Sequence, residues 1–194
     1  SYSVSDINVA ENALRDGLHP LAREHPVSAM YSTNSAQVVR NRAFTVIMAA
    51  YEQELPPEEW VKVVESGEFD GKPWPEGDES FDVLRDYWKG RALAVAGRYN
   101  EAIETVKVSL DNTAASDSIK QASARLMAYC MARDGDAHAA AALLERAGVD
   151  SPAVVLDRAR LLLHADMAEE AVAVLEPLMV DTQKVEVAAV ARLL

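Results

Sequence analysis

Several residue types are scarce in this 194-residue chain, and each scarcity excludes a class of protein. There is one cysteine, Cys130, so the chain cannot close an internal disulfide. Aromatic residues make up only 6% of the sequence, which disfavours a β-sandwich because such cores depend on aromatic and β-branched side chains. No apolar run reaches the roughly 18 residues that a membrane-spanning helix needs. We therefore expect no membrane insertion.

Basic residues are also scarce, with 19 Lys and Arg against 31 Asp and Glu, a net charge of −12. A chain this acidic is not expected to bind nucleic acid or an anionic membrane surface. Most of the negative charge lies in residues 52–82, which carry eleven acids against Lys62 and Lys72, a net charge of −9. The composition leaves the compartment open between cytoplasm and periplasm.

The sequence holds no recognisable arrangement for catalysis. None of its four histidines shows the spacing of a zinc site, and we expect His19 and His25 to lie in a surface loop because Pro20 and Pro26 flank them. Cys130 lies within an apolar helical pattern, which is typical of an inert buried thiol. Motifs for a nucleophile or a phosphate-binding loop are missing. We therefore expect no enzyme, no cofactor and no metal.

A short motif recurs three times in the second half of the chain. The copies are GRYNEAI (97–103), GDAHAAA (135–141) and DMAEEAV (166–172). Their first residues, Gly97, Gly135 and Asp166, lie 38 and 31 positions apart, which averages close to the roughly 34-residue period of one class of helical repeats. Because each copy stands between two apolar patterns of helical period, the motif predicts the turn of a helical hairpin.

Small residues occupy matched positions on the two helices of each predicted hairpin. The pairs are Gly90 with Ala102, Ala128 with Ala140, and Ala159 with Ala171. Small side chains at matched places let two helix backbones approach closely. In the first hairpin we expect Gly97 to end one helix, Tyr99 to wedge the turn and Ala102 to permit the contact.

These residues carry a resemblance to tetratricopeptide (TPR) repeats over 83–181. The first copy matches best, through Gly90, Gly97, Tyr99, Ala102 and Ile103. The second has Ala137 in place of the aromatic residue, and the Pro that ends the family's pattern is missing from every copy. The resemblance implies an all-α fold: a right-handed superhelical stack of antiparallel helix hairpins.

The chain divides by pattern into four parts. They are a helical N-terminal extension (1–66), an acidic Pro- and Gly-rich linker or lid (67–80), three TPR-like hairpins (81–181), and a capping helix or truncated fourth repeat (182–194). Within the extension we expect helices at 4–18, 34–55 and 57–66, of which the last two are candidates for one degenerate hairpin. Trp74, held between two prolines, is either a rigid anchor for a partner or part of a lid that folds back with Phe69.

The resemblance also implies that the first helices of successive hairpins line a concave groove. Its positions here are Leu84, Tyr87, Arg91, Arg125, Tyr129, Arg133, Leu156, Arg160 and His164. Four arginines on one surface of an acidic chain predict a site that attracts an acidic peptide. The alternative is that these arginines only balance neighbouring acids such as Asp86 and Asp157. Tyr87 and Arg91 stand where the family's carboxylate clamp has Lys and Asn, so the clamp is not reproduced.

The sequence therefore predicts a non-catalytic protein–protein interaction module, a scaffold or assembly factor that binds a peptide or protein segment. The main alternative is a structural subunit that packs through its helices in a homo-oligomer or larger complex, and an accessory domain of an enzyme is a third. A groove lined by arginine and tyrosine favours binding, whereas an apolar convex face would favour self-assembly.

Overall fold

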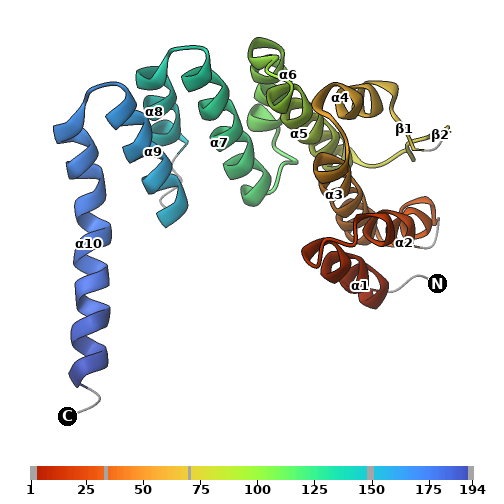
Figure 1. Ribbon diagram of the computed structural model, residues 1–194, viewed down its shortest axis with the longest axis horizontal. Coiled ribbons are helices and arrows are strands. Elements are labelled where there is room, and N and C mark those ends of the chain that lie inside the picture. The colour runs from red at the N-terminus through yellow and green to blue at the C-terminus, as the bar shows by residue number, and fades with distance from the viewer. Residues whose placement is uncertain (1–3, 33–34, 70, 148–150, 192–194) are drawn as a thin grey trace. The chain divides into compact units, whose positions relative to one another are not determined.

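The computed structural model describes residues 4–32, 35–69, 71–147 and 151–191, and within these ranges it is almost entirely helical (Figure 1). The elements are α1 (Val4–Arg15), α2 (His19–Tyr31), α3 (Gln37–Glu54), α4 (Pro57–Ser66), β1 (Glu68–Phe69), β2 (Lys72–Pro73), α5 (Glu79–Val95), α6 (Tyr99–Asp111), α7 (Asp117–Arg133), α8 (Ala137–Arg146), α9 (Pro152–His164) and α10 (Ala168–Ala191). The two short strands pair antiparallel with each other. The prediction of an all-α protein is confirmed.

Four of the helix-to-helix turns share one backbone geometry. Each has a residue in the left-handed region: Gly17 (φ 75°), Gly97 (φ 79°), Gly135 (φ 102°) and Asp166 (φ 59°). In every case the next residue donates its N–H to the carbonyl five positions earlier, at 2.8–2.9 Å. This bond satisfies a free carbonyl at the end of the first helix. The three predicted turn residues therefore behave alike, and Gly17 adds a fourth turn that the sequence analysis did not group with them.

The matched small residues are buried in all four of these hairpins. They are Ala10 and Ala22, Gly90 and Ala102, Ala128 and Ala140, and Ala159 and Ala171. At Gly90 a Cβ atom would overlap the Cγ2 atom of Val106 on α6 and meet the carbonyl oxygen of Ala102 at 3.4 Å. Only glycine permits this approach of α5 and α6, so the small residues set how closely the helices pack.

The chain forms two compact units, Ser1–Lys120 and Gln121–Leu194, and the boundary falls within α7. The core of the first unit includes large side chains: Phe44, Trp60, Phe69 and Phe81 are all almost fully buried. In the second unit α9 packs against α8 and α10. Its buried cluster is built from small and medium side chains, namely Ala141, Ala159, Leu162 and Ala171.

Two segments differ from the sequence analysis. Residues 19–25 were expected in a loop, but they belong to α2, because Pro20 falls in the first turn of the helix, where proline is tolerated. The end of the third hairpin and the expected helix at 182–194 form one continuous α10 as far as Ala191, with Pro177 inside it. Residues 192–194 lie outside the described residues.

Candidate functional site

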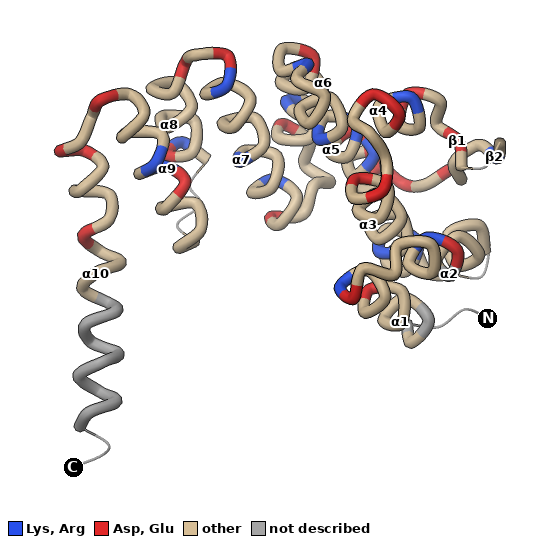
Figure 2. Tube along the Cα trace, in the orientation of Figure 1, with Lys and Arg blue, Asp and Glu red and all other residues tan. Residues whose placement is uncertain are grey.

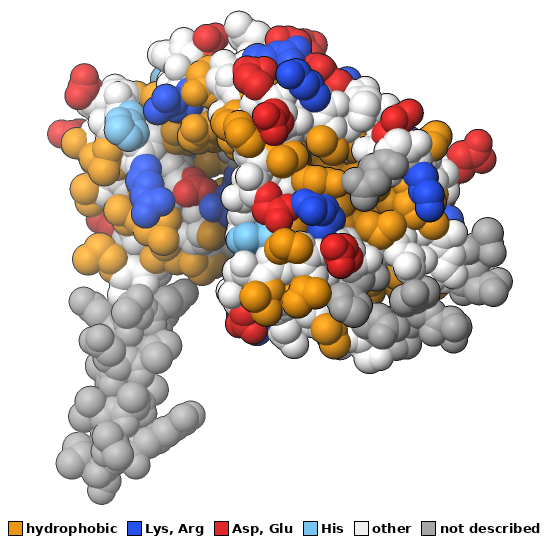
Figure 3. Space-filling view, turned by 45° about the vertical axis from the view of Figure 1, so that its right-hand side comes forward, with side chains coloured by type: hydrophobic (Ala, Val, Ile, Leu, Met, Phe, Trp, Pro, Cys, Tyr) orange, Lys and Arg blue, Asp and Glu red, His pale blue; other side chains and the backbone are white. Residues whose placement is uncertain are grey.

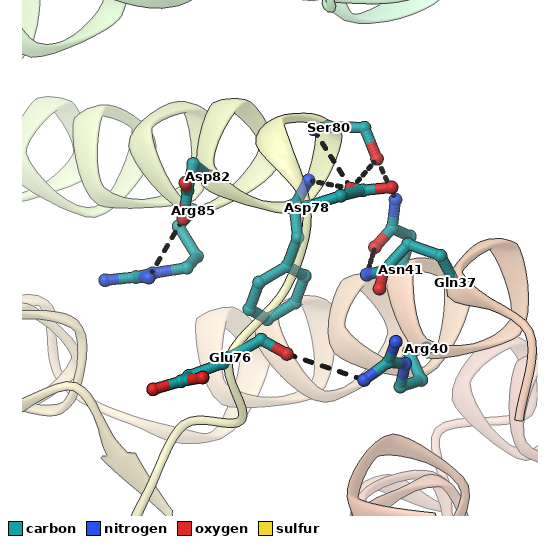
Figure 4. A network of polar contacts seen from close by, with 9 residues as sticks. Gln37, Arg40, Asn41, Glu76, Asp78, Ser80, Asp82 and Arg85 are labelled. Carbon is teal, nitrogen blue, oxygen red and sulfur yellow. Dashed lines mark hydrogen bonds and ion pairs between the residues drawn. The ribbon is translucent and has the colours of Figure 1, made fainter. Parts of the chain in front are cut away.

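The N-terminus of α5 is tied to α3 by a chain of polar contacts (Figure 4). The Asp78 carboxylate accepts hydrogen bonds from the backbone N–H groups of Ser80 (3.1 Å) and Phe81 (3.2 Å), and so caps the helix. The Ser80 hydroxyl donates to the same carboxylate (2.5 Å) and accepts from Asn41 Nδ2 (3.0 Å). Gln37 Nε2 donates to Asn41 Oδ1 (2.7 Å). These contacts fix one wall of a cavity.

This α3–α5 cavity has a volume of about 570 Å³ and lies entirely within the first unit. Its apolar surface comes from Val38, Val83, Leu84 and Ile119, and its polar edge includes Asn41. Val38 is 64% exposed. The volume lies within the range of roughly 300–1,000 Å³ that small-ligand pockets occupy.

The charged groups around this cavity are already engaged. Arg42 pairs with Glu11 of α1 at 2.8 Å and donates to Asn8 Oδ1 at 2.9 Å. The hydrogen bond from the Ser80 hydroxyl outweighs burial and, with the Ser80 and Phe81 amides, lowers the pKa of Asp78. That carboxylate therefore stays charged and bound to its helix. The cavity presents apolar surface and neutral polar groups rather than a cationic site.

Three of the predicted groove residues lie on α5 in the first unit. Leu84 is buried and lines the α3–α5 cavity. Arg91 pairs with Glu52 of α3, with 2.9 Å between Arg91 Nη2 and Glu52 Oε1, and lies within 3.5 Å of the Tyr87 hydroxyl. Burial opposes the charge of Arg91, but the hydrogen bonds and charge of Glu52 outweigh it and raise the pKa of the guanidinium. Arg91 is thus held by a carboxylate of its own chain.

The other predicted groove residues lie in the second unit. Arg125 on α7 pairs with Asp157 on α9 (2.6 Å), and Arg160 lies 3.7 Å from the same carboxylate. Arg125, Tyr129, Arg133, Leu156, Arg160 and His164 are all exposed. Asp157 therefore brings Arg125 and Arg160 together. Asp157 is one of the two acids that the alternative interpretation named, whereas Arg91 pairs with Glu52.

Large apolar side chains lie beside these arginines. Tyr129 follows Arg125 by one turn of α7 and is 49% exposed, while Leu156 and Leu163 precede and follow Arg160 on α9 with 44% and 54% exposure. Residues at such spacings share one side of a helix. Figure 2 marks the basic residues along α7 and α9, and Figure 3 shows hydrophobic and basic side chains adjacent on this unit. We call the surface formed by Arg125, Tyr129, Leu156, Arg160 and Leu163 the α7–α9 face.

Trp74 lies against the aromatic residues of the first unit. Its ring centroid is 5.0 Å from that of Phe44 and 5.5 Å from that of Phe69, and the Arg85 guanidinium stacks over it at 5.5 Å. Its backbone N–H donates to the carbonyl of Gly67 at 2.7 Å. Trp74 thus packs on Phe44 of α3 and on Phe69 of β1.

Three further observations concern metal binding, the thiol and the membrane, and each is limited to the part of the chain that the structure describes. There, no three or more His, Cys, Asp and Glu side chains form a group that would hold a metal ion. Burial raises the pKa of the Cys130 thiol to about 11, which leaves it protonated and a poor nucleophile at neutral pH. No helix in the described ranges has the length and apolar character to cross a membrane.

Sequence reasoning missed two features. The hairpin of α1 and α2 carries the same spacing as the others, with Ala10, Gly17 and Ala22 at the places of Gly90, Gly97 and Ala102. The spacing of this hairpin was therefore visible in the sequence. Its motif differs from the first copy because His19 stands at the place of Tyr99. The α3–α5 cavity had no signal, because its walls come from segments far apart in the sequence. No family model, curated protein or solved structure matches the chain.

Proposed function

We propose that this chain is a TPR-like helical-repeat protein, whose hairpins stack in a right-handed superhelix, and that it acts as a non-catalytic protein-interaction module. The common turn geometry of four hairpins and their buried small residues support the repeat. As a scaffold or assembly factor it would bind a peptide or protein segment through the exposed sides of its helices.

The α7–α9 face is the observation that carries this proposal. Tyr129, Leu156 and Leu163 are each about half exposed, although α7 and α9 bury other side chains, among them Cys130 and Val154. A helix that buries one side against its own unit and exposes large apolar groups on another has a second surface to cover. Clustered exposed apolar side chains of this kind mark interaction sites.

Affinity capture with the full chain as bait tests the function. A partner retained by the wild type should be lost with the double variant Tyr129→Ala and Leu163→Ala. The control variant is Val108→Ala, because Val108 is an equally exposed apolar residue on α6, in the first unit. A partner that both variants retain equally would contradict binding through the α7–α9 face.

A structural subunit is the second candidate, and α10 favours it. Val172, Met179 and Val180 are all about half exposed or more on this helix, and such a surface suits packing against another copy. Sedimentation velocity distinguishes the two functions. A structural subunit should self-associate at micromolar concentration and lose that association with Met179→Glu, whereas an interaction module should stay monomeric without its partner.

A further inference from the structure

The α7–α9 face carries an excess of positive charge on a strongly negative molecule. Two guanidinium groups, those of Arg125 and Arg160, share the single carboxylate of Asp157, at 2.6 and 3.7 Å. The longer contact leaves Arg160 loosely held, and its side chain is 73% exposed. Among the described residues, these two guanidinium groups therefore share one carboxylate, which leaves an excess of one positive charge.

Other arginines of the described chain show a different arrangement. Arg91 pairs with Glu52 at 2.9 Å, and Arg158, two residues before Arg160 on α9, pairs with Glu145 of α8 at 2.8 Å. In these pairs one carboxylate serves one guanidinium. The two-to-one arrangement at Asp157 is thus not the general pattern of charge balance in this protein.

The apolar side chains frame this charge. Leu156 and Leu163 lie one turn before and one turn after Arg160 along α9, and Tyr129 lies one turn beyond Arg125 along α7. An occupant of the face would meet cationic groups in the middle and apolar surface around them. Guanidinium forks bind carboxylates in a bidentate way, and tyrosine supplies rigid contact area.

We infer that the α7–α9 face binds an acidic amphipathic segment of a partner protein, with an Asp or Glu placed between large apolar side chains. The inference rests on the proposed function, for which it names the chemical class of the partner. The partner's carboxylate takes the open positions on Arg160 and competes with Asp157 for Arg125. A nucleic acid does not fit, because a net charge of −12 repels a polyanion and two arginines are too few to offset it.

A phage display selection of random 12-residue peptides on the full chain tests this inference. We expect the selected peptides to be enriched in Asp and Glu next to Leu, Ile or Phe. One selected peptide, labelled with fluorescein, is then titrated by anisotropy at 50 and 300 mM NaCl. Its affinity should fall as salt rises, since the Debye length shrinks with ionic strength.

Three variants connect the binding to named groups. Arg160→Ala should weaken the peptide about 5- to 20-fold, while the matched control Arg158→Ala should leave the affinity unchanged because Arg158 is engaged by Glu145. Asp157→Asn should tighten binding, because it removes the carboxylate that competes for Arg125 and Arg160. A residue with only a structural role would not produce this gain.

Circular dichroism checks that each variant is folded. Because the Arg160 side chain is highly exposed, we expect its substitution to leave the fold intact.

The possible results distinguish a failure of this inference from a failure of the proposed function. The inference would be overturned if the selected peptides were not enriched in acidic residues. It would also be overturned if neither Arg160→Ala nor Asp157→Asn changed the affinity of the peptide. If binding were instead lost with Val38→Glu in the α3–α5 cavity, the interaction module would stand with its site in the first unit. If no peptide were enriched on the native chain over a denatured control, peptide binding itself would be contradicted.

Discussion

At the scale of single residues, the space between paired helices is set by side chains no larger than a methyl group. Ala102 is fully buried, and its carbonyl oxygen lies 3.4 Å from where a Cβ at Gly90 would stand. Native packing leaves few voids to absorb additional atoms. The α5–α6 hairpin therefore depends on the small size of both residues.

We expect Ala102→Leu to destabilise the protein by about 1–3 kcal/mol, because the three added carbons have no space between α5 and α6. Urea unfolding followed by circular dichroism measures the change. The control is Glu104→Leu, which adds an apolar side chain at an exposed position of the same helix and should change stability little. Equal stability of Ala102→Leu and the wild type would refute the proposed register of the hairpin.

Cys130 offers a test by pH. Its thiol has a pKa of about 11 because burial disfavours the thiolate, so we expect iodoacetamide to modify it slowly at pH 8 and about tenfold faster per pH unit above that. The folded state holds the proton that the unfolded state loses first, so stability should decline as pH rises from about 9 towards 11. Mass spectrometry of alkylated protein, with a urea-unfolded control, measures the reaction. Rapid native modification at pH 8 would mean that Cys130 is accessible.

At the scale of elements, the acidic segment before α5 is anchored rather than independent. Phe69 is buried, Trp74 packs on Phe44, and Asp78 caps α5. The sequence alone had left a linker and a lid as alternatives for 67–80. The Pro and Gly residues that suggest a linker shape a two-stranded turn whose aromatic side chains return to α3.

We expect Trp74→Ala to loosen this segment, because the substitution removes the ring contacts with Phe44 and Phe69. A Glu-specific protease has an exposed site at Glu76, and it should cut Trp74→Ala there faster than the wild type. The matched control is Trp88→Ala, which removes an aromatic side chain of α5 that packs on Trp60, away from the segment. Equal cutting of the wild type and Trp74→Ala at Glu76 would show that the ring does not hold the segment in place.

At the scale of the whole molecule, the two units differ in what they bury. The first unit encloses Phe44, Phe69 and Phe81 in aromatic contacts, whereas the cluster of the second is built largely on alanine and leucine. Large aromatic side chains bury more apolar area per residue and contribute more to stability. The second unit should therefore open at a lower free energy than the first.

Hydrogen exchange followed by mass spectrometry tests this difference. We expect peptides from α9 in the second unit to exchange their amide protons sooner than peptides from α3 in the first, because local opening follows local burial. Added partner peptide should slow exchange in α9 selectively if it binds the α7–α9 face. Equal protection of α3 and α9 in the free protein would contradict the difference in stability between the units.

Much of the local structure was predictable because it depends on neighbours in the sequence. The left-handed turns at Gly97 and Gly135 follow from residues that lie beside them, and Asp166 adopts the same conformation without being glycine. The acidic block at 52–82 and the burial of Ala102 were likewise visible in the pattern. The hairpin at Gly17 has the same spacing of small residues and could have been predicted from the sequence in the same way.

Only the tertiary structure decided which distant residues meet. Arg91 pairs with Glu52, 39 positions away in the sequence, and Arg125 pairs with Asp157, 32 positions away. Neither ion pair can therefore be predicted from the local sequence pattern. The same holds for Trp74 on Phe44. The sequence by itself determined that four arginines stand at the predicted groove positions, because helical spacing is local. Which of them a carboxylate of the chain already holds depends on how α3, α5, α7 and α9 pack, because an ion pair forms only where folding brings two charges within a few ångströms.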